Sequence, residues 1–305
     1  MRGRRLGAAL RRYRLAARLD QEHAADALGC STAKTSRIET GANSARVAEV
    51  RYLLDLYGID DPPARRRLER LARNATKRGW WVNQPVPVPA KLGDYLALES
   101  DATFIRTWQT TLVPGLLQTA EYTRALAAAN AIPNTEEEIE RSAAIRQERR
   151  KRFLESGARL AAVIREPALT SRGLPPKTRR AQLLDLLWFH QQPLITLQVL
   201  PLDEWACATG SPPFVMLSFD GEWAPSAVVQ DTHQESVVLE DEHLTSPCAH
   251  AFDALRSAAL TTEQTRTFIQ ELIADLPEEE EPARGAAYFG ATAWRAFTEG
   301  LTAGR

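Results

Sequence analysis

The segment from Leu19 to Gly41, LDQEHAADALGCSTAKTSRIETG, constrains the fold of this chain more than any other. Two short helical patterns flank Gly29-Cys30-Ser31, and small or apolar residues recur at helical spacing in the first pattern. Asp20 and Ser31 are residue types that favour the N-cap of a helix. Glycine readily adopts the left-handed conformation that ends a helix, as Gly29 could here. The segment therefore predicts two helices joined by a tight turn.

The second of these helices has the residues of a helix that enters the major groove of DNA. Its small, polar and basic side chains are expected to face outward, whereas Thr35 and Ile38 face inward. Threonine and alanine allow close approach and contact thymine methyl groups, and arginine pairs with guanine through two hydrogen bonds. A plain helical hairpin with a solvated basic face is the alternative.

The same segment resembles the helix-turn-helix of XRE/Cro-type DNA-binding domains, whose motif residues here include Gln21, Leu28-Gly29 and Ile38-Glu39. The resemblance implies an all-α head of five helices. It places Gln21 at a phosphate or an outer base, and Thr32, Ala33 and Arg37 at base edges. The implied DNA-binding residues are Gln21, Ser31, Thr32, Ala33, Lys34, Ser36 and Arg37, with Lys34 and Ser36 at the backbone or a neighbouring base.

Charge is unevenly distributed along the 305 residues, although the formal net charge is only -1. Met1–Trp80 contains 18 basic and 9 acidic residues, a net charge of +9, which leaves -10 for the remainder. A basic head on an acidic body is typical of a head that meets DNA phosphate while the body does not compete for it. Part of the arginine-rich helix expected over residues 2–18 either faces phosphate or is simply solvated.

The cysteines and the apolar segments indicate a cytoplasmic protein. Cys30, Cys207 and Cys248 are far apart and form no CxxC pair, which favours reduced thiols. No apolar run follows the basic N-terminus, and polar residues interrupt the most apolar stretch, Leu183–Leu202. We therefore expect neither a signal peptide nor a membrane span.

Composition shifts divide the chain into five parts, and the whole is predicted to be an α+β multidomain protein. They are a head (1–78), a proline-rich linker (79–91), a regulatory or interaction body (92–276), an acidic linker (277–287) and a tail helix (288–305). The body is expected to be mixed α/β with about five strands. Trp80 and Trp81 in the first linker are either an anchor on the body or a wall of a ligand site.

A second resemblance covers the body. The stretch VPGLLQTAEY, Val113–Tyr122, resembles the hallmark of a domain of unknown function that follows XRE-type heads in many actinobacterial regulators. The resemblance implies a regulator that is often encoded beside a small partner protein, which modulates it. We take the residues around the hallmark as a candidate pocket: Trp108, Pro114, Gly115, Leu116, Gln118 and Tyr122.

The tail has the spacing of a helix that docks in a groove. Trp294, Phe297 and Leu301 fall at i, i+3 and i+7, on one face of a helix. Tyr288–Gly304 also resembles the C-terminal end of the small partner proteins, either as a natural fusion or as an artificial joining. The expected docking residues are Tyr288, Phe289, Trp294, Phe297 and Leu301. An ordinary terminal helix that closes the body is the alternative.

Catalytic motifs are lacking in the sequence. It contains no GxxxxGK[ST], GxGxxG, HExxH or GxSxG. His243, Cys248 and His250 could be drawn as a metal site, but we read them as part of a loop, and their spacing matches no known metal pattern. We expect no enzymatic activity, no cofactor and no metal.

Together these patterns predict a sequence-specific transcriptional regulator that binds double-stranded DNA as a homodimer. Its activity would be controlled through the body by a small partner protein or a ligand. The alternative is a protein-interaction module, antitoxin-like or a sensor, that binds a small partner in a groove while DNA binding is secondary.

Overall fold

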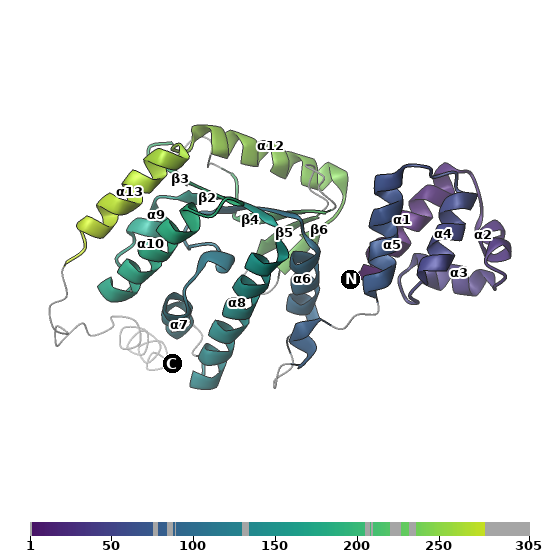
Figure 1. Cartoon of the computed structure of the whole chain (residues 1–305), viewed down its shortest axis with the longest axis horizontal. Coiled ribbons are helices and arrows are strands. Elements are labelled where there is room, and N and C mark those ends of the chain that lie inside the picture. Colours follow the sequence, from purple (N-terminus) through teal and green to yellow (C-terminus); the bar gives the residue numbers. More distant parts are fainter. Residues whose placement is uncertain are drawn as a thin grey trace, which may run out of the picture.

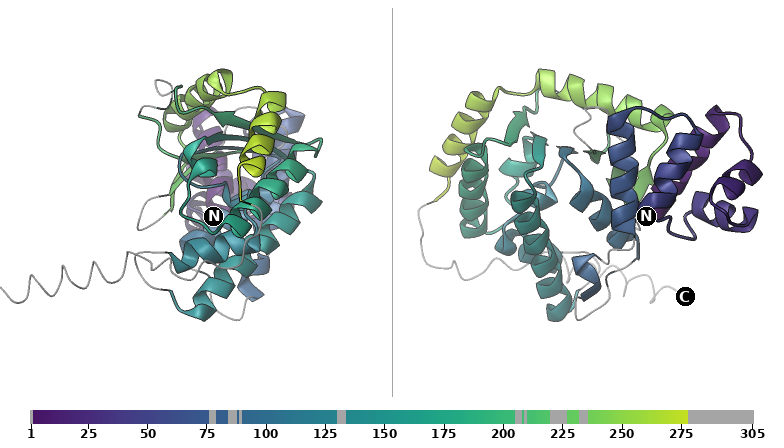
Figure 2. Two further views of the ribbon diagram at one scale, coloured as in Figure 1. Left: turned by 90° about the vertical axis from the view of Figure 1, so that its left-hand side faces the viewer. Right: turned by 45° about the vertical axis from the view of Figure 1, so that its right-hand side comes forward.

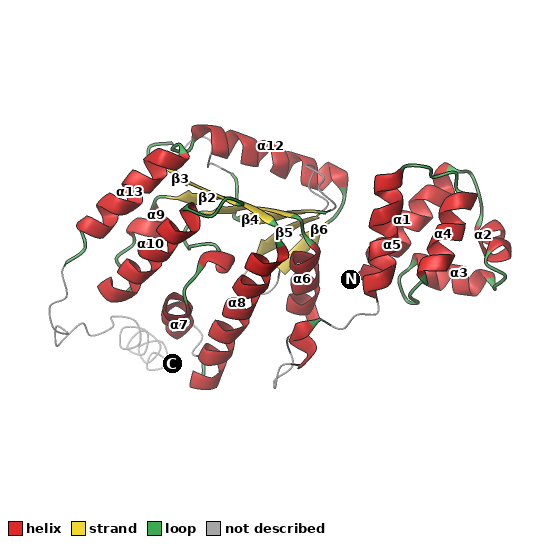
Figure 3. Ribbon diagram, in the orientation of Figure 1, coloured by secondary structure: helices red, strands yellow, loops and turns green. Residues whose placement is uncertain are grey.

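An all-α head precedes a body that contains one β-sheet (Figures 1 and 3). The computed structural model describes residues 2–75, 79–83, 88, 90–129, 134–204, 208, 210–219, 227–231 and 236–277. The predicted fold class, α+β with a helical head and a mixed body, is confirmed. None of the helices in these ranges is long and apolar enough to cross a membrane.

The head contains five helices, as predicted. They are α1 (Arg2–Ala16), α2 (Gln21–Ala27), α3 (Thr32–Glu39), α4 (Val47–Leu56) and α5 (Pro62–Ala75). Local signals place α2 and α3: the Asp20 side chain accepts hydrogen bonds from the Glu22 and His23 amides, and Ser31 accepts one from Lys34. Gly29 is left-handed, with φ of +58°.

A single apolar core joins the five helices. Leu6 and Leu10 from α1 pack with Ile38 from α3, Leu53 from α4 and Leu68 from α5, all at most 1% exposed. The core holds α3 by its inner face. The outer face of α3 therefore stays available.

Within the described ranges the body has six strands, where the sequence predicts about five. They are β1 (Phe104–Gln109), β2 (Arg159–Arg165), β3 (Ile195–Leu200), β4 (Phe214–Ser218), β5 (Ala227–Asp231) and β6 (Ser236–Leu239). Their order is β3-β2-β1-β4-β5-β6. The β3-β2-β1 half is parallel, and β4, β5 and β6 add to it in antiparallel pairs.

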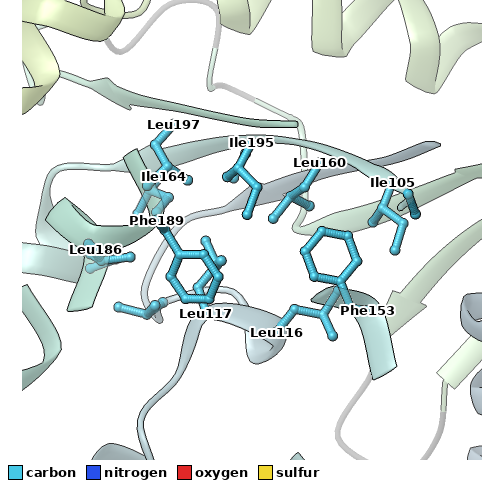
Figure 4. Packing of buried hydrophobic residues seen from close by; sticks show 14 of the residues in the cluster. Ile105, Leu116, Leu117, Phe153, Leu160, Ile164, Leu186, Phe189, Ile195 and Leu197 are labelled. Atoms are coloured by element: carbon cyan, nitrogen blue, oxygen red, sulfur yellow. The ribbon is translucent and has the colours of Figure 1, made fainter. Parts of the chain in front are cut away.

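Helices cover both faces of the sheet. They are α6 (Ala90–Asp101), α7 (Ala120–Ala128), α8 (Glu136–Ser156), α9 (Pro167–Thr170), α10 (Pro176–His190), α12 (Glu242–Ala258) and α13 (Thr262–Ala274), with 3-10 turns η1 (Trp80–Asn83) and η2 (Gly115–Leu117). The larger core lies between the sheet and η2, α8 and α10, where Leu116 and Phe153 face Leu160 (Figure 4). The other face packs against α12.

The helix α12 begins ten residues earlier than the sequence predicts. We expect a helix only from Phe252, because Pro247 and the polar residues before it are typical of a loop. Instead Asp241 caps the helix by accepting a hydrogen bond from the His243 amide, and Pro247 lies inside it. Packing of Phe252 and Leu255 against the sheet outweighs the local propensity.

Candidate DNA-binding surface and the motif loop of the body

The outer face of α3 presents most of the predicted DNA-binding residues to solvent. Ser31, Thr32, Ala33 and Arg37 are exposed, and Ser36 is half-buried. The inner face is closed, because Thr35 and Ile38 are each 1% exposed, as the sequence predicts. Both α2 and α3 lie on the side of the head that is turned away from the body (Figures 1 and 2).

The two basic residues of α3 differ in their contacts with the rest of the described chain. The Lys34 ammonium lies 2.6 Å from Glu49 Oε1 on α4, and that hydrogen bond raises the pKa of Lys34. The Arg37 guanidinium makes no hydrogen bond or ion pair with any residue that the structure describes. Arg37 is therefore the α3 cation with its donors available for a base edge.

A buried ion pair ties the end of α3 to α1. Arg14 donates from Nε to Glu39 Oε1 at 2.6 Å and from Nη2 to Oε2 at 3.0 Å, and its Nη1 donates to the Leu19 carbonyl at 2.7 Å. Gln21 Nε2 also donates to Glu39, at 2.9 Å. Gln21, a predicted DNA contact, is thus half-buried and holds Glu39 through its amide nitrogen.

The backbones of α1 and α3 touch at a glycine. A Cβ atom added at Gly7 would lie 2.3 Å from the Ile38 carbonyl oxygen and 2.5 Å from that of Glu39. Because both neighbours are backbone atoms, no side-chain rotation can relieve the clash. Gly7 therefore permits the close approach that sets the position of α3.

One arginine of α1 connects the head to the body. Arg5 Nε lies 2.9 Å from Glu240 Oε1, and the guanidinium stacks 3.8 Å from the centre of the Phe219 ring. The Arg5 side chain is 10% exposed. Of the arginines expected on the solvated face of α1, Arg5 and Arg14 are therefore committed to interfaces within the protein, which corrects the sequence-based description of this helix.

The two linker tryptophans make different contacts. Trp81 lies against Gly79 and Gly93, where an added Cβ atom would come within 2.2 Å and 3.1 Å of its ring. The Arg152 guanidinium lies 5.3 Å from the Trp80 ring centre. Both tryptophans also line a groove of about 380 Å³ beside α6 and α8. The anchor and the wall are thus compatible readings of this pair.

The segment Val113–Thr119, which we call the motif loop, is held by buried glutamines. Gln118 is 2% exposed, and its Nε2 donates to the Val113 carbonyl at 2.6 Å. Gln182 of α10 donates to the Leu117 carbonyl at 2.7 Å and accepts from the Thr119 amide at 2.9 Å. Arg146 of α8 donates to Gln118 Oε1. The motif residues thus satisfy buried backbone groups that would otherwise destabilise the loop.

The candidate pocket proposed from the sequence does not form as a unit. Trp108 is completely buried on the α12 face of the sheet, where its Nε1 donates to the Ser211 carbonyl at 2.9 Å. Leu116 and Tyr122 pack on the opposite face. Pro114 and Gln118 are buried in the motif loop, and Gly115 lies beside Arg146 and Arg149. Grouping Trp108 with the others was wrong, because its side chain points to the opposite face of the sheet.

Two further groups of predicted residues are the docking residues of the tail and the histidines and cysteine near α12. The docking residues Tyr288, Phe289, Trp294, Phe297 and Leu301 lie outside the described residues, as does Cys207. His243, Cys248 and His250 lie on α12, not in a loop. Within the described ranges, no three histidine, cysteine, aspartate or glutamate side chains are grouped so as to hold a metal ion.

Sequence reasoning missed Arg14 as a functional support, although a signal was available. Leu6, Leu10 and Arg14 are spaced by four residues, so Arg14 continues the apolar face of α1 toward the core. An arginine at such a position needs a buried acid, and Glu39 is the acidic residue that the helix-turn-helix motif supplies.

Two family models match separate parts of the chain. Residues 5–73 match a family model described as a helix-turn-helix domain, which indicates a DNA-binding regulator. Residues 92–271 match the model of the domain of unknown function DUF5753. No curated protein and no solved structure matches the chain. The helix-turn-helix domain precedes the DUF5753 domain in the sequence. The DUF5753 model covers more than half of the chain, so the chain belongs to the DUF5753 family.

Proposed function

We propose that this protein is a sequence-specific transcriptional regulator that reads double-stranded DNA with the outer face of α3. The observation that carries the proposal is Arg37, which is exposed on α3 together with Thr32 and Ala33 and whose guanidinium has no partner among the residues that the structure describes. These residue types suit a guanine edge and thymine methyl groups, respectively. Buried contacts of Glu39 and Gly7 fix the helix that carries them.

The test is a comparison of two arginine variants on an operator selected from random duplexes. Arg37→Ala should weaken operator binding by about 5- to 150-fold, the equivalent of about 1–3 kcal/mol, and should relax base preference at one position. Arg51→Ala removes the same charge from an exposed arginine of α4 and is the matched control. It should cause a smaller loss. Wild-type protein that shows no sequence-selective, salt-dependent binding would refute the proposal.

We further propose that the body controls DNA binding and that the active form is a homodimer. The contact of Arg5 with Glu240 and Phe219 supports control, because it couples α1 to the sheet. If the body controls the head, Arg5→Ala should change operator affinity while leaving the base preference intact. Identical affinity in wild type and Arg5→Ala would argue against this coupling. Sedimentation with and without operator DNA tests the dimer.

The small partner protein is the proposed source of control, and its tail is the segment that 288–305 resembles. Trp294→Ala in the full chain should alter operator binding or thermal stability if the tail docks on the body. No change in either measurement removes the docking idea. The rival interaction module predicts instead that the body binds the partner while the head shows no base preference.

A further inference from the structure

The body contains an apolar cavity that the proposed function does not use. It has a volume of about 220 Å³ and lies between α7, the segment before the motif loop, α9 and the start of α10. Its apolar lining comes from four separate parts of the chain: Leu112, Val113, Leu126, Leu169, Leu174 and Leu183. The lining is mostly hydrophobic, as in sites for small organic molecules.

Two polar groups at this cavity lack a complete set of partners. Arg179 lines it, and the buried Nε of this residue has no hydrogen-bond partner in the described part of the chain. Burial and the neighbouring Arg172 both lower the pKa of Arg179, so the site favours an incoming negative charge. An unpaired donor in an apolar wall is costly unless a ligand satisfies it.

The second group is the phenol of Tyr122. Tyr122 is 3% exposed, and its oxygen accepts a hydrogen bond from the Val113 amide at 3.2 Å. Among the residues that the structure describes, the phenol hydrogen has no acceptor. A tyrosine hydroxyl can donate and accept at once, so this hydrogen is available to an acceptor in the cavity.

The volume limits the size of a ligand. An apolar cavity of about 150 Å³ is known to accommodate benzene. The cavity here is larger by roughly half, which leaves room for one ring and a short polar arm. We propose that it binds a small apolar monocarboxylate, with its ring or chain among the leucines, its carboxylate on Arg179 and one carboxylate oxygen accepting from Tyr122.

The position of the cavity gives such a ligand a route to the motif loop. Val113, Tyr122 and Gln182 line the cavity, and Gln182 also holds the Leu117 carbonyl and the Thr119 amide. The ligand would therefore contact the residues that fix the loop. Its role as a regulatory signal rests on the proposed function, whereas the binding itself does not.

The experiment is isothermal titration of the full chain with 3-phenylpropionate and with the neutral 3-phenylpropionamide. The acid should bind at least tenfold more tightly than the amide, because hydrogen bonds to charged groups contribute about 1.5–3 kcal/mol. Arg179→Met should remove this preference, and Tyr122→Phe should weaken binding of the acid several-fold. Arg256→Met, which removes an exposed arginine of α12 on the other face of the sheet, should change acid binding by less than threefold.

Each other outcome overturns the site. Equal binding of acid and amide, or no binding of either at millimolar concentration, refutes it without any variant. If the acid bound only to a chain that ends at residue 276, we would conclude that the tail, and not a small molecule, occupies the cavity in the full chain. Operator binding by the protein without added acid is measured in parallel. Protein that binds the acid but not operator DNA would refute the proposed function and leave this site supported. Protein that binds operator DNA but not the acid would refute this site alone.

Discussion

The substitution Glu39→Gln tests whether a buried ion pair, and not only apolar packing, holds the recognition helix. Arg14 and Glu39 are 5% and 6% exposed and share two hydrogen bonds. A glutamine retains the shape of Glu39 but has one oxygen acceptor and no charge. Arg14 would then keep at most one of its two bonds to this side chain and remain as a buried, uncompensated cation.

The expected loss follows from that geometry. Breaking a buried pair by removing one partner costs about 3–5 kcal/mol. The amide oxygen still accepts one bond, and the Leu19 carbonyl still accepts from Arg14, so we expect the lower end, about 3 kcal/mol. Glu69→Gln is the matched control. It breaks a pair of the same geometry with Arg51, which is 59% exposed, and should cost less than about 1 kcal/mol.

Hydrogen–deuterium exchange of the full chain measures both variants. Glu39→Gln should lower the protection of α1 and α3 amides by roughly a hundredfold, the equivalent of about 3 kcal/mol, and leave the body unchanged. The double variant Arg14→Met with Glu39→Leu should recover much of the protection, since no buried charge remains. Equal losses in Glu39→Gln and Glu69→Gln would show that the buried pair does not anchor α3.

Three further perturbations have expected outcomes. Burial raises the pKa of Glu39, but hydrogen bonds from Arg14 and Gln21 outweigh it and the pKa is lowered overall. The stability difference between wild type and Glu39→Gln should therefore be full above the ordinary value of about 4.3 and shrink as pH falls below it, in urea denaturation at pH 7, 5 and 3.5. Gly7→Ala should lower the free energy of unfolding by about 1–3 kcal/mol and reduce operator affinity. Gly3→Ala should do neither, because an added Cβ atom there would lie at an ordinary 3.5 Å from the nearest backbone atom. Equal effects of the two variants would contradict the close contact at Gly7. Gln182→Leu leaves the Leu117 carbonyl unpaired and should cost about 1–3 kcal/mol by thermal denaturation; no shift would mean that the motif loop is held otherwise.

Local signals made the head predictable. The caps at Asp20 and Ser31 and the left-handed Gly29 each act within four residues, so the sequence determines where α2 and α3 begin and where the turn lies. The capping box of Thr135 and Glu138 marks the start of α8 in the same way, and Gly157 marks its end. Which residues of α3 face outward follows from helical periodicity alone.

Long-range choices were not predictable to the same degree. Trp108 lies only six residues from Pro114, but successive residues of a strand point to opposite faces, so sequence proximity does not bring it to the motif loop. The length of α12 depends on packing of Phe252 and Leu255 against the sheet, which overrides Pro247. The burial of Arg14 required knowledge of its partner 25 residues away.

The length of α3 sets how much sequence one head can distinguish. Eight residues at 1.5 Å each give a helix of about 12 Å, which spans roughly four base pairs. A four-base-pair word recurs about once in every 256 positions of random sequence, and a genome presents on the order of a million or more competing sites. One copy of α3 therefore carries too little information to mark a single promoter. Two copies, separated by a fixed number of helical turns, would multiply the length of the word that is read.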